Sequence, residues 1–91
     1  QHEGKVPLSN LLHFKGALEE VAKVREFGLN KYPDAESYKQ VPNALLTDAL
    51  MRHLFEAVDE ELAEDSQCFH LAHLITNGLM LLQKRLDNVR N

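Results

Sequence analysis

Residues 42–88 decide the fold and read PNALLTDALMRHLFEAVDEELAEDSQCFHLAHLITNGLMLLQKRLDN. Pro42 suits the first turn of a helix, because its ring fixes a helical φ and a backbone N–H at that position would have no partner within the helix. Apolar residues then recur at helical spacing and predict a long helix from about Asn43 to Glu64. Ser66 is a suitable N-cap for a third helix that extends to about Asn88. The short connection makes these two helices antiparallel neighbours.

The residues before this stretch predict one further helix. Gly16–Lys31 carries apolar side chains at mostly helical spacing, and Pro33 ends the pattern. Residues 1–15 read as an extended or short-turn lead-in, and no useful length of chain alternates with the period of two that indicates a strand. We therefore expect a single all-α domain over residues 1–91. Its helical body, residues 16–91, should place three main helices in an antiparallel, bundle-like arrangement.

Composition narrows the class of protein. The chain has 91 residues, of which 44% are apolar, and a core this small favours burial against a second copy. Cys68 is the only cysteine, so no disulfide forms within the chain and a reducing cytoplasm is expected. No apolar stretch approaches the roughly 20 residues of a membrane helix. The net charge of −4 argues against binding of a nucleic acid polymer, but not against an anionic small molecule bound through a metal ion.

A histidine pair lies at the start of the expected third helix. His70, His73 and Asn77 follow the spacing i, i+3 and i+7, which places the three side chains along one helix face. Two imidazoles in this position suit a metal ion, a phosphate or a catalytic water. The alternative is that both rings only cap the helix or fill the edge of the core.

Acidic residues dominate the end of the expected second helix. Arg52 and His53 are followed by six carboxylates within ten residues: Glu56, Asp59, Glu60, Glu61, Glu64 and Asp65. Carboxylate oxygens are hard ligands that suit Mg²⁺ or Mn²⁺, although a solvated acidic helix end has the same appearance. Glu19 and Glu20 on the first helix have the same two interpretations. They could face the acids or histidines of a neighbouring helix, or they could form a surface ion pair with Lys23.

Several segments in order along the chain resemble one family, the phage-type dATP/dGTP diphosphohydrolases, which are related to the all-α MazG-like nucleoside triphosphate pyrophosphohydrolases. The segments that carry the resemblance are Gly4–Ser9, Ala17–Val24, Phe27-Gly28 with Lys31-Tyr32, Arg52–Leu54, Asp65-Ser66, and His70-Leu71-Ala72-His73 with Asn77. Together they cover nearly the whole chain.

The resemblance implies an α-helical and usually oligomeric enzyme that cleaves a purine deoxynucleoside triphosphate between its α- and β-phosphates. The implied cofactor is Mg²⁺ or Mn²⁺, which positions the triphosphate, offsets its charge and makes a bound water nucleophilic. The candidate metal ligands by this resemblance are Glu20, Glu61 and Asp65.

The same resemblance supplies the other candidate site residues. His53, His70 and His73 are the candidate catalytic residues, which bind metal or phosphate or orient the attacking water. Asn77 is expected to hydrogen-bond a ligand or a neighbouring histidine, and Lys31 is expected to contact phosphate.

The chain departs from the family pattern at three places. Lys23 stands where an acid would complete a Glu-Glu-x-x-Glu pattern, Ser37-Tyr38 replaces an Asn-Trp pair, and Cys68 replaces a glycine. A non-catalytic helical module for nucleotide binding or protein assembly is therefore the alternative to an enzyme, and a hydrolase for a different nucleotide is a third possibility.

Overall fold

The computed structural model describes residues 4–90 and contains three main helices. The elements in chain order are η1 (Leu8–Phe14), α1 (Lys15–Lys31), η2 (Ser37–Gln40), α2 (Asn43–Asp59) and α3 (His70–Arg90). The predicted all-α fold is confirmed, because no strand forms within residues 4–90 and the only sheet-like pairing there is an isolated bridge. No helix in this described part of the chain is long and apolar enough to cross a membrane.

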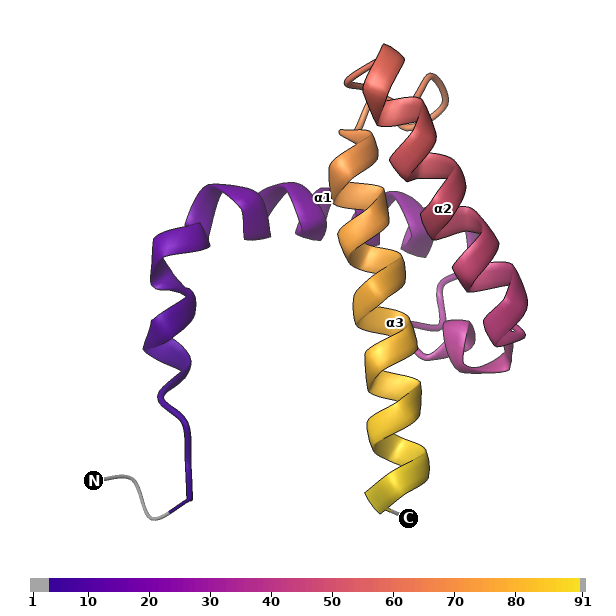
Figure 1. Cartoon of the computed structure of the whole chain (residues 1–91). Helices are drawn as coiled ribbons and strands as arrows, with labels where there is room; N and C mark the ends of the chain where they lie inside the picture. The colour runs from indigo at the N-terminus through magenta and orange to yellow at the C-terminus, as the bar shows by residue number, and fades with distance from the viewer. Residues whose placement is uncertain (1–3, 91) are drawn as a thin grey trace.

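The helices α2 and α3 form an antiparallel hairpin, and α1 lies across it (Figure 1). Val24 of α1 packs with Cys68 and Ala72 in the small core where α1 meets the beginning of α3. The core therefore sits near the end of the molecule at which α2 passes into α3. The connection between α1 and α2 is held against α3 by a side chain, because Lys84 donates a hydrogen bond to the Val41 carbonyl oxygen.

The helix α2 is five residues shorter than the sequence predicts, and α3 begins later. Helix α2 ends at Asp59 rather than near Glu64, and its last turn contains no basic residue. Carboxylates at a helix C-terminus oppose the negative end of the helix dipole, which explains why the acidic run leaves the helix early. The N-cap predicted at Ser66 was wrong, since α3 starts only at His70.

The loop 60–69 replaces the predicted continuation of α2. Its two sides are joined by backbone hydrogen bonds: His70 N–H donates to Glu61 O at 2.7 Å, and Ala63 N–H donates to Cys68 O at 2.8 Å. At its tip Gln67 adopts a positive φ of 59°. These bonds close the loop so that the end of α2 faces the beginning of α3.

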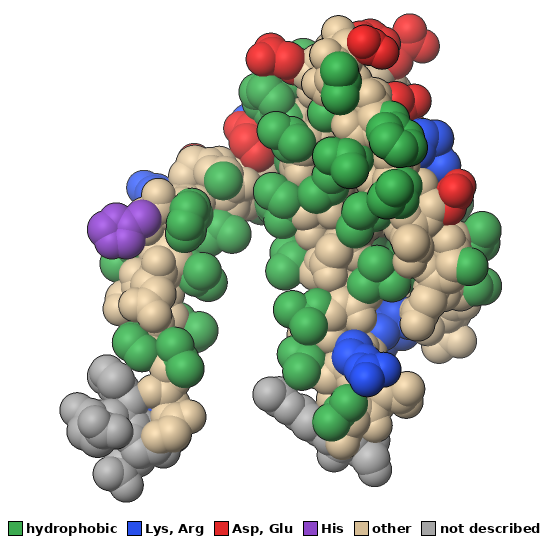
Figure 2. All heavy atoms as spheres, viewed as in Figure 1, with side chains coloured by type: hydrophobic (Ala, Val, Ile, Leu, Met, Phe, Trp, Pro, Cys, Tyr) green, Lys and Arg blue, Asp and Glu red, His purple; other side chains and the backbone are tan. Residues whose placement is uncertain are grey.

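The N-terminal arm, residues 4–14, extends away from the hairpin (Figure 1). The 3₁₀ helix η1 buries none of its residues, although its sequence is rich in leucine. The lead-in therefore contains the short turn that the sequence suggests, but its apolar side chains remain on the surface. Figure 2 shows hydrophobic side chains on the arm and on the side of the main body that faces it.

Candidate functional site

His53 of α2 meets His70 and His73 of α3, which lie much further along the chain, beside the loop 60–69. His53 Nδ1 lies 2.9 Å from His70 Nδ1, which is hydrogen-bond distance between two ring nitrogens. The rings of His53 and His73 are stacked, with centroids 4.5 Å apart and an interplanar angle of 9°. The ring of His53 therefore contacts the rings of both His70 and His73, and the three histidines form one cluster.

Glu56 adds a carboxylate to this cluster. Its Oε1 lies 3.6 Å from His70 Nδ1 and 3.9 Å from His53 Nδ1. The residue is one helical turn beyond His53 on α2, so both side chains project from the same face. His53, Glu56 and His70 form a group whose ligand atoms all lie within 4.8 Å of one another, which is compact enough to hold one metal ion.

Burial keeps two of the imidazoles, His53 and His73, neutral. The side chain of His53 is 17% exposed. Burial lowers the pKa of His53, and the neighbouring His73 and His70 lower it further against an opposing effect of Glu56. Burial also lowers the pKa of His73, whereas nearby Asp65 raises it. Both rings are neutral near pH 7, the form that binds a metal ion or accepts a proton.

The cluster opens into a pocket of about 460 Å³ with a strongly acidic rim. Figure 2 shows acidic side chains gathered at this end of the molecule. Arg52 is the single arginine or lysine that lines the pocket, and it forms an ion pair with Asp48 at 3.2 Å. The acidic residues that line the same pocket are Glu56, Glu60, Glu64 and Asp65. This charge attracts cations and repels a free triphosphate.

Ser66 positions His73 from the loop. Its Oγ lies 2.7 Å from His73 Nε2 and accepts a hydrogen bond from Cys68 N–H at 3.1 Å. The hydroxyl can accept from the backbone and donate to the ring at the same time. The sequence indicated Ser66 as a helix cap, but its hydroxyl instead stabilises the loop and one imidazole.

Of the candidate metal ligands, only Asp65 lines the histidine pocket. The Glu20 carboxylate on α1 is engaged by Lys23 at 2.9 Å. Glu61 contributes its backbone oxygen, which accepts from His70 N–H, and its side chain is not among those that line the pocket. The structure therefore does not bring the three predicted carboxylates together.

The remaining candidates, Lys31 and Asn77, do not line this pocket either. The Lys31 ammonium nitrogen stands 4.6 Å from the centroid of the Phe27 ring, at the exposed end of α1. Asn77 is half-buried on α3, one turn beyond His73. Glu56 belongs to the cluster but was not among the predicted metal ligands, although the sequence shows its i+3 spacing from His53.

The donor atoms that do meet fit Mg²⁺ poorly. Mg²⁺ prefers oxygen ligands in octahedral geometry, whereas two of the three gathered donors are imidazole nitrogens. Imidazole suits zinc and its neighbours in the first transition series, and Mn²⁺ lies between the two classes. Of the two expected cofactors, Mn²⁺ is therefore the better match to this cluster.

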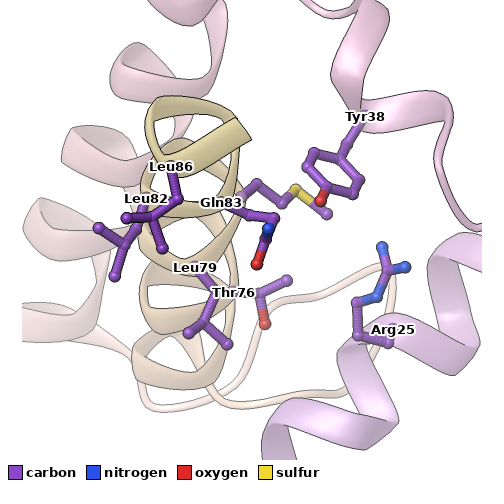
Figure 3. A pocket seen from close by; sticks show the side chains of 8 residues that line it. Arg25, Tyr38, Thr76, Leu79, Leu82, Gln83 and Leu86 are labelled. Atoms are coloured by element: carbon purple, nitrogen blue, oxygen red, sulfur yellow. The ribbon is translucent and has the colours of Figure 1, made fainter. Parts of the chain in front are cut away.

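A second pocket of about 320 Å³ lies between α1, η2 and α3, and it shares no lining residue with the histidine pocket. Figure 3 shows Tyr38 and Arg25 on one side, with Thr76 and Gln83 of α3 facing them. The Arg25 guanidinium carbon lies 5.7 Å from the Tyr38 ring centroid. A ring face, a guanidinium and an amide at an apolar wall suit a planar polar group.

Comparison with known proteins identifies one family. The family model described as dATP/dGTP diphosphohydrolase, N-terminal, matches residues 1–90. Neither the curated proteins nor the solved structures provided a match.

Proposed function

The chain belongs to the dATP/dGTP diphosphohydrolase N-terminal family, and from that premise we propose that it hydrolyses a purine deoxynucleoside triphosphate to the monophosphate and pyrophosphate. The convergence of His53, His70 and Glu56 at an acidic pocket carries the proposal. Dependence on Mg²⁺ or Mn²⁺ and a cytoplasmic location, where nucleotide pools are hydrolysed, belong to the same proposal.

The charge of the pocket determines how this chain would receive a substrate. Four carboxylates and one arginine line it, so a triphosphate meets repulsion unless cations accompany it. A divalent ion supplies that compensating charge when it is bound. The neutral imidazole of His73, which is not one of the three grouped ligands, is then available to take a proton from an attacking water. In this reaction water loses a proton and adds to the α-phosphorus, the bond from the α-phosphorus to the α–β bridging oxygen breaks, and pyrophosphate departs with that oxygen.

We expect the purified chain to release pyrophosphate from dATP or dGTP when Mn²⁺ or Mg²⁺ is present, with Mn²⁺ the more effective ion. The assay measures pyrophosphate and the nucleoside monophosphate against dCTP and dTTP as comparison substrates. Release of inorganic phosphate or of tripolyphosphate would show a different cleavage site. Absence of any product from all four nucleotides would reject hydrolysis.

The alternative is a non-catalytic module for nucleotide binding or assembly. The ion pair between Lys23 and Glu20 favours it, because this pair occupies a carboxylate that the family resemblance assigns to a metal. Such a module would melt at a higher temperature in the presence of dATP or dGTP and metal, without forming pyrophosphate.

The exposed surface supports assembly with a second copy of the chain. The accessible surface is 7178 Å², whereas a compact monomer of 10.4 kDa exposes about 5,400 Å². The difference exceeds the roughly 800 Å² that each partner buries in a standard protein interface. One outer face of α3 carries apolar side chains at helical spacing that are 40–55% exposed: Leu71, Ile75, Leu79 and Leu82. We propose that this face packs against another copy.

Leu79→Glu tests the homo-oligomer. A buried, unpaired carboxylate is expected to weaken self-association by at least about 100-fold, which corresponds to about 2.7 kcal/mol. Light scattering after size-exclusion chromatography should show the mass of an oligomer for the wild type and of a monomer for the variant. Thr47→Glu, at an exposed polar position on α2, serves as the control. A monomeric wild type at high concentration would reject the interface.

A further inference from the structure

The Nδ1 atoms of His53 and His70 face each other with a carboxylate beside them, an arrangement that points to a cation. We infer that His53, His70 and Glu56 hold a resident divalent ion of the imidazole-binding class, such as Zn²⁺ or Co²⁺. This ion is distinct from any Mg²⁺ that arrives with a triphosphate. The inference stands apart from hydrolysis, because the same three side chains would bind the ion in a non-catalytic module.

The spacing of the donor atoms has the size of a metal site. The two Nδ1 atoms and Glu56 Oε1 form a triangle with sides of 2.9, 3.6 and 3.9 Å. A point about 2.0 Å from all three corners lies within that triangle, and zinc bonds to imidazole and carboxylate are about 2.0–2.2 Å long. One ion can therefore reach all three donors with little movement of the backbone.

The contact between the two ring nitrogens requires either a hydrogen-bonding proton or a cation between them. When both rings are neutral, one Nδ1 must donate its proton to the other, because two lone pairs at 2.9 Å repel each other. A metal ion can take the place of that shared proton, with both rings then protonated at Nε2. The carboxylate of Glu56 offsets part of the charge of the ion in the same position.

The surroundings match a metal site with one accessible side. The two imidazoles are largely buried, whereas the Glu56 side chain is 48% exposed and borders the pocket. Three protein ligands leave a fourth position for water or for an oxygen of a bound anion. The acidic residues at the rim raise the local concentration of cations. Carboxylates alone would favour Mg²⁺, but the paired imidazoles select against it.

Metal binding to the chain stripped with EDTA tests the inference without any nucleotide. One equivalent of Zn²⁺ per chain should bind, and a hundredfold excess over the dissociation constant should raise Tm by roughly 10 °C or more. Co²⁺ should bind at the same stoichiometry and give visible absorption of a low-coordinate site. Mg²⁺ at the same concentration should leave Tm unchanged.

Matched variants locate the ion. His70→Ala and Glu56→Gln should each weaken Zn²⁺ binding on the order of 100-fold or more. Glu56→Gln keeps the shape of an exposed side chain, so it reports on the ion even if His70→Ala does not fold. His13→Ala on η1 and Glu26→Gln on α1 change exposed residues of the same types and should bind like the wild type.

Two results would overturn the inference. One is equal Zn²⁺ affinity in wild type, His70→Ala and Glu56→Gln, which would place the ion elsewhere. The other is an equal response to Mg²⁺ and Zn²⁺, which would indicate an oxygen-ligand site. Neither result depends on whether the chain releases pyrophosphate, so the metal inference and the proposed hydrolysis fail separately.

Discussion

His70→Ala is expected to lower the rate of pyrophosphate release from dATP or dGTP by at least about 100-fold. His70 is 5% exposed and touches both His53 and the Glu56 carboxylate, so its removal separates the members of the cluster. Initial rates at saturating nucleotide measure kcat, and a titration of nucleotide measures KM. Loss of a group that acts on the reaction itself should lower kcat more than it changes KM.

Structural collapse is the competing explanation for such a loss. Circular dichroism of His70→Ala should retain the helical content of the wild type, and Glu56→Gln should lower the rate in the same direction while preserving packing. His13→Ala, on the exposed arm, should retain full activity. A folded His70→Ala protein with wild-type kcat would remove the histidine cluster from the proposed reaction.

Leu46→Ala is expected to destabilise the fold by about 2–4 kcal/mol. Leu46 is the buried residue of α2 and is 6% exposed, so truncation of its side chain removes apolar contacts and leaves a cavity. Urea unfolding followed by circular dichroism gives the free energy of unfolding. Protein concentration must be equal in all samples, because association of copies would stabilise the folded state.

The neighbouring Leu45 provides the matched control, since it is 60% exposed on the same helix. Leu45→Ala removes the same atoms from a solvated position and should change the free energy of unfolding by less than about 0.5 kcal/mol. An equal loss in the two variants would show that the exposed face of α2 is also buried in the protein in solution.

The helices were predictable because their apolar spacing is regular, whereas the boundary at Asp59 was not. Leu62 continues the apolar pattern of α2 beyond the true end of the helix, where it pairs with Phe69 in the loop. The competing effect is electrostatic: carboxylates accumulate where the helix dipole disfavours them. The crossing of α1 over the hairpin depends on which side chains pack, and periodicity alone does not specify it.

One part of the candidate site was predictable from the sequence and another part was not. Residues close together in sequence, His70 and His73, were placed on one helix face by spacing alone. The approach of His53 to His70 depends on how the loop 60–69 closes, which no local pattern specifies. The engagement of Glu20 by Lys23 follows from ordinary i, i+3 pairing, the structural alternative already visible in the sequence.

Closure of the loop 60–69 by the hydrogen bond from His70 N–H to Glu61 O affects the order in which contacts form during folding. His53 and His70 are only 17 residues apart, so the entropy lost in bringing them together is small. Contacts of such short sequence separation form rapidly during folding. The contact between His53 and His70 is therefore expected to form earlier in folding than the packing of Val24 of α1 against Cys68 and Ala72, which joins residues much further apart in the chain.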